Sequence, residues 1–114
     1  MGKFMKVKEL AKLLKLDVIT NEDNLCGEVN GCYIGDLLSW VMGKAEADNV
    51  WITIMSNINI VAVASLSDVA CVLLAEGVTV EENVRQTAEE KGINLLSSPK
   101  DAYALATLLA ARGI

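Results

Sequence analysis

The sequence predicts an α/β fold with a small, mainly parallel sheet that is built from βαβ units and flanked by helices. Three observations support this prediction. Short runs rich in β-branched and aromatic residues are typical of strands. These runs alternate with segments whose apolar residues recur at helical spacing. Signals for helix starts and ends lie between them. Because parallel strands need a crossover, which is usually a helix, this alternation favours a parallel sheet.

The N-terminal part begins with a predicted helix at about residues 6–15. Its apolar residues recur at helical spacing, and its lysines lie along another face. Two extended segments follow, at 17–20 and 28–34, and a polar turn separates them. A second helix is predicted at 36–44, with Asp36 suited to its cap or first turn.

Three strands form the predicted core of the sheet, near residues 50–55, 70–75 and 93–97. We expect them to be parallel to one another. The segment 60–66 is apolar enough for a strand or a helix. We expect a helix there, because a crossover is needed before the next parallel strand.

Two capping signals predict the last helices. Thr79 and Glu82 form a T-x-x-E capping box, which starts a helix that Gly92 ends. The run Ser-Pro-Lys-Asp at 98–101 offers a cap, a proline in the first turn and an acid at the third position. It predicts a helix over residues 99–112.

The length and composition are those of one globular domain, spanning residues 1–114. With 53% hydrophobic and 22% charged residues, the chain has enough apolar material for a core. Its apolar stretches are interrupted before the roughly 18–20 residues that cross a bilayer. The N-terminus does not resemble a signal peptide. We therefore expect a cytoplasmic protein without a membrane partner, in which residues 1–5 form a flexible extension.

Residue types that common catalytic and metal sites require are missing. The chain has no histidine, so neither a Ser-His nor a Cys-His pair can form. Cys26, Cys32 and Cys71 lack the paired spacing of zinc ligands, and we expect them to be reduced and partly buried. No P-loop and no dinucleotide-binding glycine motif is present. We expect no metal, no cofactor and no catalytic residue.

Polar residues follow each of the three predicted core strands. In an open parallel sheet, ligands bind beyond the carboxyl ends of the strands, where loops lead into helix N-termini. We therefore expect a small polar, anionic or nucleotide-like ligand to contact this edge. The same residue types are common in ordinary turns and caps, so a purely structural role is the alternative. The candidate ligand-binding residues are Ser56, Asn57, Asn59, Glu76, Gly77, Ser97 and Ser98.

Two other functions are consistent with parts of the sequence. A small enzyme would use this edge with Glu76 as a general base, although no evident nucleophile accompanies it. A DNA-binding protein would use the first helix, with Lys8, Lys12 and Lys15. A helix-turn-helix, however, needs a second helix after a short turn, where residues 17–20 are predicted to be extended. Beyond residue 15 the chain holds fourteen acidic and five basic residues, which argues against nucleic-acid binding.

The helix at 36–44 has apolar residues on more than one face. Leu37 and Val41 are expected on one face, Leu38 and Met42 on an adjacent one, and Trp40 on a third. The C-terminal helix likewise has more apolar residues than one buried face requires. Such helices are buried on all sides or leave an exposed patch, so we expect a homodimer. The alternative is that the first helix and the 17–34 segment fold over Trp40 and bury it.

Four segments of the sequence resemble the DRTGG domain family, and together they extend over most of residues 6–112. They are VKELAKLLKLDVIT from Val7, GCYIGDLLSWVMGKA from Gly31, the strand VWITIM from Val50, and a long final segment from Ile60. The last reads IVAVASLSDVACVLLAEGVTVEENVRQTAEEKGINLLSSPKDAYAL.

The resemblance implies a regulatory or dimerising domain and not a catalytic one. The family occurs beside HPr kinase modules, in phosphotransacetylases and between the CBS domains of some pyrophosphatases. Small stand-alone relatives occur near iron-hydrogenase genes. It thus implies a redox (hydrogenase-type) or phosphotransfer enzyme as a partner. The family's Asp-Arg motif falls near Ser56 and Asn57, where no arginine is present. Its Thr-Gly-Gly motif falls at 75–77, where one glycine remains, and these departures put the family's anion site in question.

Overall fold

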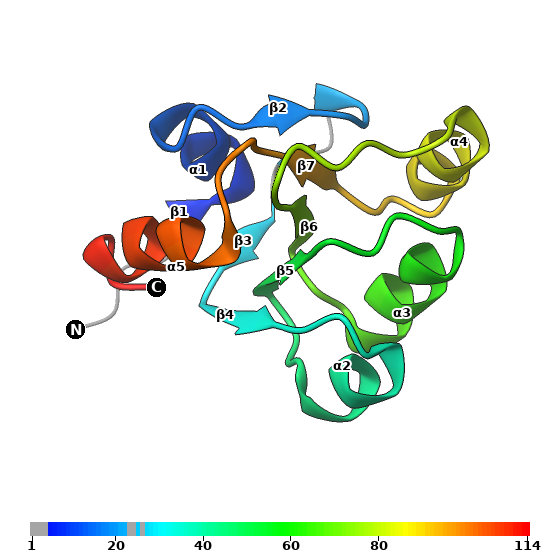
Figure 1. Ribbon diagram of the computed structural model, residues 1–114, viewed down its shortest axis with the longest axis horizontal. Helices are drawn as coiled ribbons and strands as arrows, with labels where there is room; N and C mark the ends of the chain where they lie inside the picture. Colours follow the sequence, from blue (N-terminus) through cyan, green and yellow to red (C-terminus); the bar gives the residue numbers. More distant parts are fainter. Residues whose placement is uncertain (1–4, 23–24, 26) are drawn as a thin grey trace.

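The computed structural model describes residues 5–22, 25 and 27–114. Over these residues, the centre of the molecule is a five-stranded sheet (Figure 1). Its parallel strands are β4 (Gly31–Ile34), β5 (Asn49–Thr53), β6 (Cys71–Leu74) and β7 (Leu95–Ser97). β2 (Asp17–Val18) pairs antiparallel with β7, so the strand order is β2-β7-β6-β5-β4.

The three predicted core strands are confirmed as parallel neighbours, although each observed strand is shorter than predicted. The extended segment at 28–34 is divided between two sheets. Its second half is β4, and its first half is β3 (Glu28–Val29), which pairs antiparallel with β1 (Met5–Lys6). Met5 is therefore part of a strand and not of the expected extension, whose residues 1–4 lie outside the described residues.

Helices cover both faces of the sheet (Figure 1). On the left in this view lie α1 (Val7–Leu13) and α5 (Ala102–Ala111). On the right lie α2 (Leu38–Lys44), α3 (Asn59–Ser67) and α4 (Glu82–Glu90). Within the described part of the chain, none of the helices is long and apolar enough to cross a membrane.

Side chains of the sheet alternate between two cores. Val50 and Ile52 pack with α1 and α5, whereas Trp51 packs with α2, α3 and α4. Because both faces are covered, the central strands consist mostly of apolar residues, and β5 is buried along its whole length. The Trp51 indole N–H donates to the carbonyl of Gly35 at 2.9 Å, which satisfies the polar atom of this buried ring.

The two predicted helix starts in the last third are wrong by a few residues. α4 begins at Glu82 with Glu81 as its N-cap, so Thr79 does not open a capping box. Val78 and Val80, which precede α4, are partly buried against the core cluster that contains Val84 and Ala88 of that helix. The N-cap of α5 is Asp101, whose carboxylate accepts a hydrogen bond from the Ala104 N–H at 2.8 Å.

The surface of α2 also differs from the expectation. Leu37 precedes the first turn and is 61% exposed, whereas Val41 is buried, so these two residues do not share a face. Trp40 is 60% exposed. The alternative in which the first helix covers Trp40 is therefore wrong, since α1 packs on the opposite face of the sheet from α2.

Candidate functional site

The carboxyl ends of β4, β5, β6 and β7 lie at one edge of the sheet, because the four strands are parallel. The predicted placement of the loops after the three core strands at one edge is thus confirmed. A cleft of about 140 Å³ opens there, which we call the strand-end cleft. It is lined by Ile34, Asp36, Ile52, Thr53, Ile54, Ala75, Glu76 and Ala102.

Asp36 is held at this cleft by two hydrogen bonds. Its Oδ1 accepts from the Thr53 hydroxyl at 2.8 Å and from the Ile54 N–H at 3.0 Å. The prediction that Asp36 caps or begins the second helix is wrong, because α2 starts at Leu38 and the carboxylate binds the end of β5 instead. The buried Thr53 hydroxyl also accepts from the Met55 N–H at 3.1 Å.

Asp36 and Thr53 were not among the candidate residues. The signal that would have found Asp36 is its position two residues after Ile34, the last residue of β4. Assigning the segment 31–34 to the parallel sheet would have placed Asp36 at the same edge as the other strand ends. Thr53 was hidden because the predicted strand continued to residue 55.

The turn after β6 uses its backbone donors internally. Glu76 and Gly77 both have left-handed conformations, with φ of 64° and 71°, and the Val78 N–H donates to Ala75 O at 3.2 Å. The Glu76 N–H donates to Lys100 O at 2.8 Å, and the Gly77 N–H donates to Ser98 O at 2.9 Å. These two amides are therefore not free to bind an anion.

The seven predicted contact residues are all described, and Glu76 alone among them lines the strand-end cleft. Asn57 accepts the Asn59 N–H at 2.9 Å with its side chain, at the start of α3. Ser98 is buried, and its hydroxyl oxygen accepts the Lys100 N–H at 3.1 Å. Ser97 is the last residue of β7, and Ser56 lies in the loop after β5. Their contact with a ligand stays a prediction.

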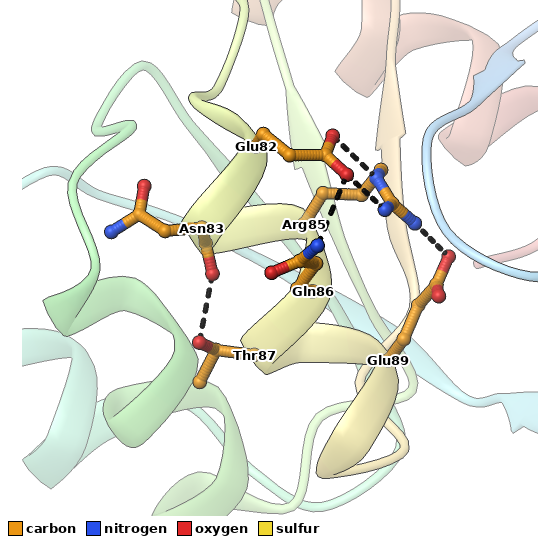
Figure 2. Close-up of polar contacts among 6 residues, drawn as sticks. All are labelled: Glu82, Asn83, Arg85, Gln86, Thr87 and Glu89. Carbon is orange, nitrogen blue, oxygen red and sulfur yellow. Dashed lines mark hydrogen bonds and ion pairs between the residues drawn. The ribbon is translucent and has the colours of Figure 1, made fainter.

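The electrostatics of the cleft favour hydrogen-bond donors over phosphate. Two carboxylates, those of Asp36 and Glu76, line it, and none of the described lining residues is basic. Arg85 does not compensate, because its guanidinium is bound on α4 between Glu82 and Glu89 (Figure 2). The Arg85 hydrogen bond lowers the pKa of the Glu82 carboxyl. The cleft is therefore suited to the hydroxyl or amino groups of a ligand.

Two of the three cysteines are described, and both are free thiols. Cys32 and Cys71 flank Val50 in register, so they lie two strand spacings, about 9.6 Å, apart and beyond disulfide reach. Burial raises the pKa of Cys71 to about 12, and the nearby Cys32 makes a smaller contribution in the same direction. Burial also raises the pKa of Cys32, to about 11. Both thiols are protonated at neutral pH, which makes them poor nucleophiles. Cys26 lies outside the described residues.

Comparison with known proteins is consistent with this fold. The family model of the DRTGG domain matches residues 8–111. Among solved structures, the chain is similar to the CBS and DRTGG domains of the regulatory region of Clostridium perfringens pyrophosphatase, complexed with its activator diadenosine tetraphosphate. The TM-score is 0.71 at 14% sequence identity, over 88% of this chain. The match spans 44% of the other chain. None of the curated proteins matches the sequence.

Proposed function

The chain belongs to the DRTGG domain family, and from this membership we propose that it is a cytoplasmic, non-catalytic regulatory module that self-associates and binds a small ligand at the strand-end cleft. The observation that carries the proposal is the segment from Ile34 to Met42. One part of this segment lines the cleft, and the adjoining part exposes large apolar side chains.

The exposed apolar side chains of this segment form what we call the α2 surface, and they are Ile34, Leu37, Trp40 and Met42. Apolar side chains of this size, grouped along one short segment, are typical of a protein interface. The Lys44 ammonium lies 5.7 Å from the centre of the Trp40 ring and leaves the ring 60% exposed. A symmetric dimer is the commonest way to cover such a surface.

Ligand binding and self-association are linked in this proposal through Asp36. The residue lies between Ile34 and Leu37 of the α2 surface, and its carboxylate faces the cleft. A ligand that binds differently to the monomer and the dimer shifts the equilibrium between them. Because Asp36 and Glu76 are acceptors, the ligand contributes hydroxyl or amino groups, as a nucleoside does. The predicted residues Ser56, Asn57, Asn59, Gly77, Ser97 and Ser98 lie in or next to the surrounding loops.

The groups at the cleft support a binding role and not a catalytic one. The Thr53 hydroxyl is engaged both as a donor and as an acceptor. Glu76 is exposed, and the second carboxylate of the lining, that of Asp36, accepts two hydrogen bonds from the end of β5. The module would therefore act on another protein, and we propose a redox or phosphotransfer enzyme. Co-purification from the source cell, followed by mass spectrometry, tests this partner.

Chemical-shift mapping with adenosine tests the ligand site. We expect perturbations at Asp36, Thr53 and Glu76. Glu76→Gln should weaken them, whereas Glu81→Gln, the same change outside the lining, should not. Sedimentation equilibrium at micromolar concentration tests self-association. A monomer with and without adenosine, together with an unperturbed cleft, would contradict the proposed function.

A further inference from the structure

A second and larger pocket lies beside α1, away from the α2 surface. Its volume is about 340 Å³, which falls within the range of roughly 300–1,000 Å³ typical of small-molecule sites. We call it the basic pocket. It is lined by Lys8, Ala11, Lys12, Lys15, Leu16, Val18, Glu22 and Leu25.

The charge of this pocket is opposite to that of the whole chain. Lys8 and Lys12 are four residues apart and are neighbours on α1, and Lys15 follows the end of this helix, so three like charges line the same pocket. Within the described residues, both ion pairs belong to Arg85 on α4, and neither involves these lysines. Among the lining residues that the structure describes, Glu22 is the single acidic one. The pocket is thus a local excess of positive charge in a chain of net charge −5.

The remaining described lining residues are apolar, and they come from α1, from β2, from the segment between these two and from the turn at Leu25. Ala11 belongs to α1, Val18 belongs to β2, and Leu16 lies between the two. Ala11, Leu16 and Leu25 are buried, whereas the three lysines are exposed. The pocket therefore has apolar walls and ammonium groups at the solvent side. This combination matches a ligand with an apolar ring and an anionic group.

Lys15 occupies a backbone position that glycine usually fills. Its φ is 55°, its N–H donates to Lys12 O at 3.3 Å, and the Leu16 N–H donates to Ala11 O at 2.8 Å. These two bonds form a Schellman motif that ends α1, and glycine is favoured at the left-handed residue. A lysine here adds a third ammonium group to the pocket at a position where glycine would fit the backbone better.

We propose that the basic pocket binds an organic phosphate that carries an apolar ring, of the nucleotide class. The strand-end cleft cannot take the same role, since its charged lining groups are carboxylates and the nearby amides are used. This inference goes beyond the proposed function and does not depend on it. A small molecule fits better than a nucleic acid, because the pocket is concave and the chain beyond residue 15 is acidic.

Titration with ATP at low ionic strength, followed by chemical shifts and calorimetry, tests the inference. We expect perturbations at Ala11, Leu16 and Val18, and weaker binding of adenosine and of inorganic phosphate. Lys12→Gln should lower the ATP affinity about tenfold, as for the loss of a charged hydrogen bond. Lys91→Gln, the same charge change at the end of α4, should leave it unchanged. An equal loss of ATP affinity in the two variants would show that only the net charge of the protein matters, and it would overturn the proposal.

Lys15→Gly separates a ligand role from a structural one. We expect this variant to unfold at a higher temperature than the natural chain and yet to bind ATP several-fold more weakly. A variant that binds ATP as tightly as the natural chain would contradict the proposed role of Lys15. Three results would each overturn the proposal that the basic pocket binds an organic phosphate. These are the absence of ATP binding, chemical-shift perturbations confined to the strand-end cleft, and tighter binding of duplex DNA than of ATP.

Discussion

The hydroxyl of Thr53 donates a 2.8 Å hydrogen bond to the carboxylate of Asp36, which lies 17 residues earlier in the chain. The same carboxylate oxygen accepts the Ile54 N–H, and the Thr53 oxygen accepts the Met55 N–H. These bonds join the loop after β4 to the loop after β5. They hold Leu37 and the start of α2 in place at the edge of the strand-end cleft.

Replacing Thr53 by valine keeps the shape of the side chain and removes its hydroxyl. The Asp36 carboxylate then loses a partner beside a buried position, as does the Met55 N–H. We expect the free energy of unfolding to fall by about 1–3 kcal/mol, measured by urea denaturation. Thr107→Val on α5, where the hydroxyl makes one exposed bond to Ala104 O, serves as the control and should cost less. Equal losses of unfolding free energy in the two variants would show that the hydrogen bond to Asp36 contributes no more to stability than an exposed hydroxyl bond does.

Acidic substitution in the α2 surface should weaken the proposed dimer. Trp40→Glu or Met42→Glu places a charge on an apolar interface, and we expect the dissociation constant to rise at least about tenfold with circular dichroism unchanged. Tyr103→Glu is the control, because Tyr103 is 79% exposed on α5, across the sheet from α2. Loss of the fold in Trp40→Glu, or an unchanged dimer, would place the interface elsewhere.

The two buried thiols should make the protein less stable at high pH. In the folded chain the pKa values of Cys32 and Cys71 are raised from 9.0 to about 11 and about 12. Above pH 9 the unfolded chain loses these protons and the folded chain keeps them, so stability falls as pH rises toward 11–12. Each pH unit lowers the free energy of unfolding by about 1.4 kcal/mol for every thiol that is ionised in the unfolded chain and protonated in the folded chain. Denaturation from pH 8 to 11, in a Cys26→Ser background, measures this slope. The slope should be smaller when Cys32 and Cys71 are replaced by alanine.

Replacing Glu76 by glycine should stabilise the protein. Glu76 has a φ of 64°, a conformation that costs a residue with a side chain roughly 1–2 kcal/mol. Part of this gain is offset because glycine is more flexible in the unfolded chain, so we expect a net rise of about 1 kcal/mol. Glu90→Gly is the matched control, since Glu90 belongs to helix α4, where glycine is unfavourable, and this variant should lose stability. Thermal unfolding of the two variants should therefore shift in opposite directions.

Much of the fold followed from local patterns in the sequence. The runs at 50–55 and 70–75 were recognisable as strands because a parallel sheet covered on both faces requires continuous apolar residues. The ambiguous segment at 60–66 was correctly predicted as a helix, α3, because parallel strands need a crossover. The shared edge of the strand ends then followed from chain direction alone. For the same reason, Glu76 could be placed near the cleft from sequence.

Contacts between distant segments decided the rest. α4 begins at Glu82 and not at Thr79, and the preceding Val78 and Val80 are partly buried against the core, a tertiary contact that no local pattern contains. Aspartate is a common helix-cap residue, yet the Asp36 carboxylate accepts its hydrogen bonds from the Thr53 hydroxyl and the Ile54 N–H at the end of β5. The basic pocket required the chain to turn after α1 and pair β2 with β7, so that Leu16 and Val18 came to face the lysines. Hydrophobic periodicity specifies which segments form helices and strands, whereas the free energy of burial and of hydrogen bonding between remote residues specifies where each element begins and what lines a site.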